Sequence, residues 1–147
     1  MNIRAAKAVD VGAMVRLEGQ SPTAAHWPKS SYRGLFDEGA PERVSLVADD
    51  AGAICGFLIA RIAGDECELE NVVVAEASQR RGVASRLIQE LVKVAGDRKA
   101  ARIFLEVRES NAAARALYEK CGLAIRGRRK SYYTAPAEDA ALYSLVL

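Results

Sequence analysis

The chain has 147 residues, and 50% of them are hydrophobic, which is enough apolar material for one domain with a substantial core. The 21 Lys and Arg residues nearly balance the 19 Asp and Glu residues, for a net charge of +2, whereas a general nucleic-acid coat carries a clear basic excess. Aromatic residues make up only 6%, too few for a base-stacking platform. The composition therefore predicts a single globular domain over residues 1–147 with no specific nucleic-acid partner.

The sequence also contains no membrane or export signal. The longest uncharged runs, at 19–28 and 51–60, are about half as long as a membrane-spanning helix requires. The first ten residues include charges at Arg4, Lys7 and Asp10, so they lack the apolar segment of a signal peptide. We therefore expect a cytoplasmic protein without membrane contact.

The cysteine and histidine content argues against metal and thiol chemistry. Cys55, Cys67 and Cys121 are widely spaced, and His26 is the only histidine. A structural zinc site takes four Cys or His ligands, so we expect three reduced, buried or half-buried thiols and no metal. A single histidine also removes Ser-His-Asp and Cys-His catalysis of the ordinary kind, unless His26 itself serves.

The first half of the chain predicts two helices followed by three strands. Residues 3–5 form a short strand, and Asp10 can cap a helix that ends at Gly19. Pro28 suits the start of a second helix, over 29 to about 38. Three segments rich in β-branched and apolar residues, separated by turn-like segments, then predict an antiparallel meander: 43–48, 53–63 and 66–74.

The second half alternates helices with strands. Apolar residues recur at three- and four-residue steps over 82–95, and Gly96 ends this helix. A strand at 102–107 and a helix at about 111–121 follow. A polar loop around Pro136 joins the two last strands, at 123–129 and 142–147. This order predicts a single α+β domain around a mixed sheet.

The segment Gln79-Arg80-Arg81-Gly82-Val83-Ala84 stands between a buried strand and the strongest helix. A strand-to-helix turn points free backbone N–H groups outward at the helix start, where the helix dipole adds partial positive charge. Two arginines reinforce that charge, and Gly82 lets another molecule approach the backbone closely. These features favour a cradle for phosphate or pyrophosphate. The alternative is an ordinary helix entry with solvated arginines.

A second group of polar residues spans the next strand and helix. Ser110 or Asn111 can cap the helix, and Asn111 and Tyr118 share one helix face. Glu106 lies within an apolar strand, where a carboxylate is costly unless it is paired or used. Each residue also has a purely structural explanation: Asn111 as a cap alone, Tyr118 as half-buried core and Glu106 as a solvent-facing side chain.

The string QRRGVA resembles the Q/R-x-x-G-x-G/A acetyl-CoA motif of the GNAT acetyltransferase superfamily, with Ala84 at its last position. The longer string LEVRESNAAARALYEKCGL resembles one branch, the RimI-type ribosomal-protein-alanine N-acetyltransferases, as do 129–133 and 138–140. The resemblance runs from Glu68 to the C-terminus and is looser over the first third. It implies the GNAT fold: a mixed, mostly antiparallel sheet of about seven strands with four helices.

The resemblance also implies how acetyl-CoA binds. In this fold the pantetheine arm lies between two splayed parallel strands, here 68–74 and 102–107, and Asn111 would contact the cofactor from the next helix. Backbone groups of three successive residues would pair with the arm: Val72, Val73 and Val74. The amides of the following segment would hold the pyrophosphate: Arg80, Arg81, Gly82, Val83, Ala84 and Ser85.

In this branch Glu106 is similar to the proposed proton acceptor and Tyr118 to the proton donor. The reaction is direct attack of an amine on a thioester, and the amine has to lose a proton first. A peptide α-amine, with a pKa of about 8, is within reach of a carboxylate acting directly or through water, whereas a lysine side chain near about 10.4 is harder. The leaving thiolate can be protonated or stabilised by a phenol, and a backbone N–H near Val72 can stabilise the tetrahedral intermediate.

A second acid competes for the role of base. Glu68 and Glu70 stand two residues apart on one face of their strand. Glu68 aligns with the catalytic Glu of another branch, which resembles histone acetyltransferases. Both acids can also simply attract a cationic peptide terminus. The residues leave Glu106 and Glu68 as alternative bases.

The acceptor groove is expected between the last hairpin and the loop that joins the first two helices, with substrate contacts by Trp27, Glu70, Tyr132 and Tyr133. Four cations at 126–130 can touch ribosomal RNA or an acidic partner, or form a solvated hairpin face. The predicted function is acetylation of a protein N-terminal α-amine, with a ribosomal protein as the favoured acceptor. A small-molecule amine or a lysine side chain is the alternative acceptor, and a binding module without catalysis is a third interpretation.

Overall fold

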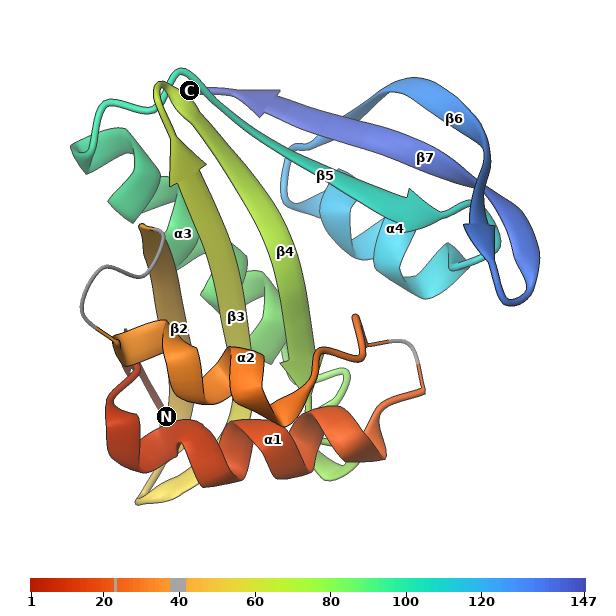
Figure 1. Ribbon diagram of the computed structural model, residues 1–147. Helices are drawn as coiled ribbons and strands as arrows, with labels where there is room; N and C mark the ends of the chain where they lie inside the picture. Colours follow the sequence, from red (N-terminus) through yellow and green to blue (C-terminus); the bar gives the residue numbers. More distant parts are fainter. Residues whose placement is uncertain (23, 38–41) are drawn as a thin grey trace.

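The computed structural model describes residues 1–22, 24–37 and 42–147. Within these residues seven strands form one mixed sheet in the order β1-β2-β3-β4-β5-β7-β6, with four α-helices on its two faces (Figure 1). The strands are β1 (Asn2–Ala5), β2 (Arg43–Asp50), β3 (Ala53–Ala63), β4 (Glu66–Val74), β5 (Arg102–Arg108), β6 (Ala124–Thr134) and β7 (Ala137–Val146). The helices are α1 (Val11–Gln20), α2 (Lys29–Arg33), α3 (Val83–Asp97) and α4 (Ala112–Lys120). The predicted α+β class and mixed sheet are confirmed, and no described helix could cross a membrane.

The predicted meander corresponds to β2, β3 and β4, which pair antiparallel, but three helix ends differ from the prediction. α2 ends at Arg33, where Gly34 caps it and a short 3-10 turn follows. The helix predicted over 29–38 is therefore too long, and its last residue lies outside the described ones. α1 and α3 continue past Gly19 and Gly96, because a glycine inside a helix costs only about 1 kcal/mol, which tertiary packing overrides.

The start of α1 is held by an ion pair rather than by the predicted side-chain cap. Asp10 precedes Val11, but its carboxylate accepts hydrogen bonds from Arg4 Nη1 at 2.8 Å and from the backbone N–H of Lys7 at 2.7 Å. Arg4 Nε also donates to Asp49 on β2 at 3.1 Å. This partly buried cluster joins the start of α1 to the first two strands.

The last hairpin has longer strands than the sequence predicts. β6 and β7 pair antiparallel and leave only Ala135 and Pro136 between them, where we predict a longer polar loop between 129 and 142. β6 is an edge strand, and most of its side chains are exposed. Because an exposed edge strand needs no apolar alternation, its polar sequence is hard to distinguish from a loop.

β4 and β5 run parallel but pair only over their first residues, and the last pair is Glu68 with Phe104. Beyond it the two strands diverge, as Figure 1 shows. β4 carries one extra residue relative to β3, since Leu69 and Asn71 pair with successive residues of β3 and Glu70 is left between them. Such a bulge bends a strand and increases its twist, so it turns β4 away from β5.

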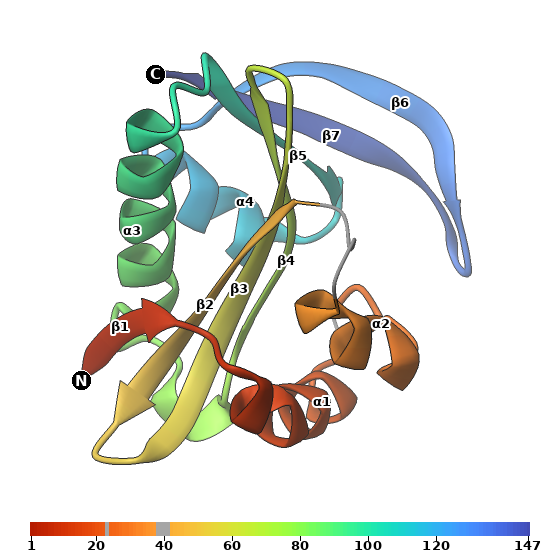
Figure 2. The same cartoon turned by 60° about the vertical axis from the view of Figure 1, so that its left-hand side comes forward.

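The same bulge changes which side chains face which core. α3 and α4 cover one face of the sheet, and α1 and α2 cover the other (Figure 2). Leu69 belongs to the apolar cluster under α3 and α4, whereas Val73 belongs to the cluster under α1 and α2. Because side chains alternate along a strand, the bulge places Glu68, Glu70 and Asn71 together on the face of α1 and α2.

Candidate active site

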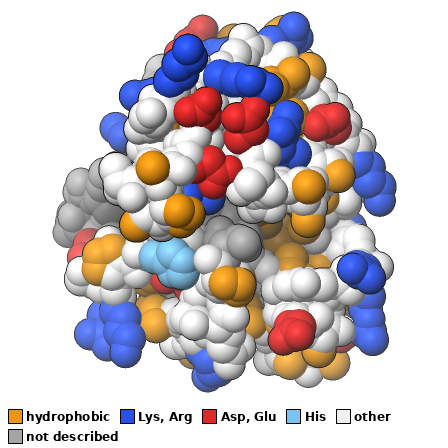
Figure 3. Space-filling model, turned by 90° about the vertical axis from the view of Figure 1, so that its right-hand side faces the viewer, with side chains coloured by type: hydrophobic (Ala, Val, Ile, Leu, Met, Phe, Trp, Pro, Cys, Tyr) orange, Lys and Arg blue, Asp and Glu red, His pale blue; other side chains and the backbone are white. Residues whose placement is uncertain are grey.

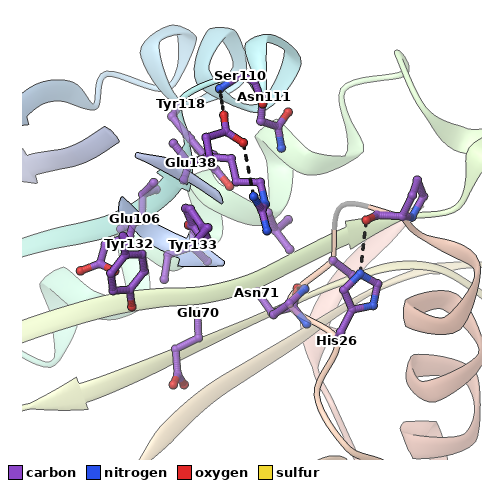
Figure 4. Close-up of a pocket in the computed structure, with 18 of the residues that line it drawn as sticks. His26, Glu70, Asn71, Glu106, Ser110, Asn111, Tyr118, Tyr132, Tyr133 and Glu138 are labelled. Atoms are coloured by element: carbon purple, nitrogen blue, oxygen red, sulfur yellow. Dashed lines mark hydrogen bonds and ion pairs between the residues drawn. The ribbon is translucent and has the colours of Figure 1, made fainter. Parts of the chain in front are cut away.

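The gap between β4 and β5 opens into a cavity of about 900 Å³. Its walls come from the two diverging strands, α4, the loop between α1 and α2, and the hairpin of β6 and β7 (Figure 4). Both candidate bases, the candidate acid and all of the predicted substrate contacts line it. The predicted residues at its surface are Trp27, Glu68, Glu70, Val72, Glu106, Asn111, Tyr118, Tyr132 and Tyr133.

Three carboxylates lie on one face of the sheet at this cavity. Phe104 pairs with Glu68, and Glu106 follows Phe104 by two residues, so Glu106 shares a face with Glu68 and Glu70. In the space-filling view, Asp and Glu side chains gather in the upper half of the molecule with Lys and Arg around them (Figure 3). The cavity wall is therefore acidic, as a site for a cationic amine requires.

Two of the three carboxylates have cationic partners. Glu106 accepts a hydrogen bond from Arg129 Nη1 at 2.9 Å. Its hydrogen bond with the Tyr132 hydroxyl raises the pKa of that tyrosine. Glu70 accepts a hydrogen bond from Arg43 Nε, also at 2.9 Å. These two acids are thus held in fixed orientations by neighbouring arginines.

Glu68 is in a different electrostatic position. It forms no ion pair with any described residue. Burial raises its pKa above the ordinary carboxyl value, and the negative charges of Glu70 and Glu106 add to this, against a smaller opposing effect of Arg61. Glu68 therefore holds a proton more readily than a carboxylate in water.

Tyr118 reaches the cavity from α4 on the other face of the sheet. It is 8% exposed, and its ring packs against Tyr143 with the ring centroids 6.2 Å apart. None of the described residues forms a hydrogen bond with its hydroxyl. The hydroxyl is not completely buried, and Tyr118 lines the cavity. Burial, with smaller contributions from Tyr133 and Cys121, raises the pKa of Tyr118 to about 12. The phenol is therefore protonated at neutral pH and has its donor free.

Asn111 forms the predicted cap of α4 and also lines the cavity. Its Oδ1 accepts a hydrogen bond from the backbone N–H of Ala114 at 3.1 Å. A carboxamide has donors as well as an acceptor, and Figure 4 shows the nitrogen of Asn111 turned toward the cavity. The capping and ligand-binding interpretations are therefore compatible.

The turn from β4 into α3 leaves backbone groups exposed. Arg80 and Gly82 both have left-handed backbone, with φ of 63° and 78°, and α3 begins at Val83. A Cβ built at Gly82 meets no atom within 4 Å, and Arg80, Arg81 and Gly82 are all exposed. Arg86 N donates to Gly82 O as the first bond of the helix, so the amides before it have no partner within α3.

The strand edge predicted to bind the pantetheine arm faces the gap through its backbone. Val72 lines the cavity, whereas Val73 is 3% exposed in the core under α1 and α2 and Val74 packs under α3. After Glu68, β4 has no paired residue on β5. This edge of β4 therefore pairs with no described strand beyond Glu68. The Val74 carbonyl accepts a hydrogen bond from Gln79 Nε2 at 3.2 Å.

The hairpin wall is built from two stacked pairs. The Arg129 guanidinium lies 4.3 Å from the centroid of the Tyr132 ring, and that of Arg108 lies 4.4 Å from the Tyr133 ring. The two tyrosine rings meet edge to face, with centroids 5.0 Å apart. Cation–π contacts and edge-to-face packing together hold both rings at the cavity.

The basic segment at 126–130 uses half of its cations within the molecule. Arg128 pairs with Glu109 at 2.6 Å, and Arg129 pairs with Glu106 at 2.9 Å. These contacts favour the interpretation of the segment as a hairpin face. Contact with RNA or an acidic partner stays a prediction for the other two cations.

Two polar residues of the cavity wall were assigned no role from the sequence. Asn71, which is 5% exposed, donates from Nδ2 to the Tyr32 hydroxyl at 2.8 Å. Glu138 accepts from Ser110 N at 2.5 Å and from Arg108 Nη1 at 3.3 Å. The available signal for Asn71 was a carboxamide directly before three valines in an otherwise buried strand, where a polar side chain needs a partner.

Comparison with known proteins establishes the family. Residues 13–123 match the family described as Acetyltransferase (GNAT) family, and the chain belongs to it. The protein is an acetyl-CoA-dependent N-acetyltransferase.

The relatives also agree with the resemblance in the sequence. A [ribosomal protein bS18]-alanine N-acetyltransferase from Salmonella typhimurium is 40% identical over 138 residues, which are 92% of this chain and 90% of that one. The crystal structure of the ribosomal-protein-S18-alanine N-acetyltransferase from Escherichia coli has a TM-score of 0.85 at 30% identity, over 99% of this chain and 92% of that one. A Bacillus anthracis acetyltransferase structure in complex with acetyl coenzyme A matches 74% of this chain and 65% of that one, at 27% identity and a TM-score of 0.68.

The contacts of Glu138, a residue of the cavity wall, predict that it contributes a pH-dependent part of the stability of the folded protein. Hydrogen bonds from Ser110, and a smaller contribution from Arg108, lower the pKa of Glu138. Its ionised form therefore stabilises the fold above the unfolded pKa of about 4.3, and this contribution is lost as the pH falls through the lower folded value. We expect Glu138→Gln to lower the melting temperature at pH 7, with a difference from the wild type that shrinks below about pH 4.

Thermal melts followed by circular dichroism at several pH values measure this difference. Glu76→Gln is the matched control, because Glu76 is exposed and has no ion pair with a described residue. It should leave the melting temperature unchanged throughout. A Glu138→Gln deficit of constant size across the pH range would contradict the ionic role.

Proposed function

We propose that this enzyme acetylates the N-terminal α-amine of a protein, with a ribosomal protein as the favoured acceptor. The two relatives named for ribosomal protein S18 alanine, at 40% and 30% identity, support this acceptor class. The single observation that carries the chemistry is the position of Glu106 and Tyr118. They line one cavity but reach it from opposite faces of the sheet.

Strand alternation explains this opposition. Leu105 and Val107 belong to the same core cluster under α3 and α4 as Tyr118. Glu106 stands between them on β5, and side chains of successive strand residues point to opposite faces, so Glu106 faces α1 and α2. An amine arriving from that face and a thioester held from the other would meet between a carboxylate and a phenol, which is the arrangement that direct attack requires.

The residues of the gap fit acetyl-CoA, which supplies the thioester. The exposed turn and the free amides of α3 suit the pyrophosphate, and they belong to Arg80, Arg81, Gly82, Val83, Ala84 and Ser85. The unpaired edge of β4 suits the pantetheine arm, which would bind as an added strand, through Val72, Val73 and Val74. Asn111 would donate from Nδ2.

Glu106 is the proposed base. It would take the proton of the acceptor ammonium directly or through one water, while Arg129 and Tyr132 hold the carboxylate in place. Glu68 is the alternative base, because burial and two neighbouring carboxylates raise its pKa and so increase its affinity for a proton. Both line the cavity on the face from which the acceptor would enter.

Tyr118 is the proposed acid. A phenol with a pKa of about 12 is a weak acid, so its hydrogen bond to the departing sulfur matters most while negative charge develops there. Its hydroxyl has no competing partner among the described residues, which leaves it free for that bond.

The acceptor would lie against the acidic wall and the aromatic rim. Glu70 contributes charge, and Trp27, Tyr132 and Tyr133 contribute flat apolar surfaces. Arg43 lies 5.4 Å from the centroid of the Trp27 ring. Charge complementarity with the amine and stacking on these rings would orient a peptide terminus.

The acceptor class is tested with peptides. We expect acetyl-CoA and the enzyme to acetylate the α-amine of a peptide that begins Ala-Arg, as located by tandem mass spectrometry. The same peptide with a blocked N-terminus and an internal lysine is the control, and it should stay unmodified because the lysine amine is harder to deprotonate. Strong turnover of polyamines or lysine side chains and none of free termini would reverse the acceptor, and no turnover of any amine would refute the proposal.

The role of Tyr118 is tested by Tyr118→Phe, which removes only the hydroxyl. We expect kcat to fall about 100-fold or more, the usual contribution of general acid catalysis, with KM for acetyl-CoA nearly unchanged. Tyr143→Phe is the matched control, because Tyr143 is also buried and its hydroxyl donates to Glu119 at 2.7 Å. A Tyr118→Phe enzyme as active as that control would remove the phenol from the chemistry.

The choice between the two bases is tested with a pair of variants. We expect Glu106→Gln to lower kcat/KM for the peptide by about 100-fold or more and to abolish the acidic limb of the pH–rate profile. Glu68→Gln should cost less than about tenfold and leave that limb in place. The opposite ranking would make Glu68 the base.

A further inference from the structure

A carboxylate lies buried beneath the acceptor side of the cavity and has no part in the chemistry proposed above. Glu18, near the end of α1, is 6% exposed and follows Leu17, which belongs to the apolar core under α1 and α2. A carboxylate in such surroundings is costly unless several hydrogen bonds satisfy it. Its partners therefore indicate what it is for.

Those partners come from the acceptor loop and from β4. The backbone N–H of Trp27 donates to Glu18 Oε1 at 2.7 Å. Asn71 Nδ2 lies 3.5 Å from the same oxygen and donates to the Tyr32 hydroxyl at 2.8 Å. Tyr32, which is fully buried, also hydrogen-bonds Glu18, and burial followed by this bond raises its pKa. The carboxylate is thus at the centre of a closed polar cluster.

The segment 24–27 depends on this cluster for its position. It belongs to no helix or strand, yet it forms one wall of the cavity. A second backbone amide, that of Ala25, donates to Asn71 Oδ1 at 3.4 Å. His26 between them has a left-handed backbone with φ of 57°, a conformation that persists only where the surroundings impose it.

We propose that Glu18 is a positioning residue for the acceptor, which holds Trp27 at the cavity wall and links it through Asn71 to the bulge of β4. This inference rests on the proposed function, since it assumes that the acceptor binds against that wall. Asn71 follows Glu70, the extra residue of the bulge, so one cluster sets both the acceptor wall and the strand that borders the gap. Loss of the carboxylate would displace the acceptor and leave acetyl-CoA binding intact.

The kinetic test compares three variants. We expect Glu18→Ala to raise KM for the acceptor peptide by about tenfold or more, as loss of a charged hydrogen-bond acceptor implies, with KM for acetyl-CoA unchanged. Glu18→Gln should restore part of this loss, because its amide oxygen can still accept from the Trp27 N–H. Asp10→Asn is the matched control. Asp10 is buried at the start of the same helix, but among the residues that the structure describes its carboxylate bonds only Arg4 and Lys7. This variant should lower stability and leave both KM values unchanged.

Tryptophan fluorescence gives a readout that needs no catalysis. Trp27 is the only tryptophan of the chain, so the emission reports on the acceptor wall alone. We expect Glu18→Ala to shift the emission to longer wavelength and to increase quenching by acrylamide, while Asp10→Asn leaves both unchanged.

The outcomes separate this inference from the proposed function. If the wild type acetylates peptides but Glu18→Ala lowers only the active fraction, with both KM values and the tryptophan emission unchanged, Glu18 is merely structural and the inference is wrong. If the wild type acetylates no peptide, the proposed function fails, and the fluorescence of the variants still decides whether Glu18 positions the wall.

Discussion

Strand β4 has to stay paired with β3 along its length while it leaves β5 after Glu68, and the extra residue Glu70 makes both possible. A regular strand would continue its parallel ladder with β5 and close the sheet. The bulge bends β4 away, so the backbone edges that a ladder would use face a gap instead. The cavity, its acidic wall and its free strand edge are all consequences of this one irregularity.

Three carboxylates on one face of the sheet repel one another. The surroundings that offset this repulsion differ among the three. Arg43 holds Glu70 and Arg129 holds Glu106, whereas burial and its acidic neighbours raise the pKa of Glu68. The site therefore contains one carboxylate, Glu106, that is paired with an arginine of the hairpin, and one, Glu68, with a raised pKa. Two residues therefore remain candidates for the base. The orientation of its carboxylate favours Glu106, and its greater affinity for a proton favours Glu68.

The sequence predicted the parts of this arrangement that depend on local patterns. Alternating apolar strands and the turn before Val83 follow from periodicity, glycine placement and charge, and they hold in the structure. The bulge at Glu70 has no recognisable pattern in the sequence of β4. It arises because β4 has one more residue than β3 between two successive residue pairs. The partnership of Glu18 with Asn71 is equally invisible, since the two are 53 residues apart in sequence and each alone is an ordinary polar residue. The hairpin was predicted too short because an exposed edge strand has no apolar face to reveal it.

The near-neutral total charge also acquires a spatial meaning. Cations stand at Arg80 and Arg81, at the turn into α3, and carboxylates stand on the opposite face of the sheet at Glu68, Glu70 and Glu106. An anionic cofactor and a cationic amine would therefore each be attracted to a different side of the same gap. If both charges lay on one face, each ligand would compete for the other's site. In the proposed mechanism, the sheet would keep the two charged regions on different sides, and the two ligands would meet in the gap between β4 and β5.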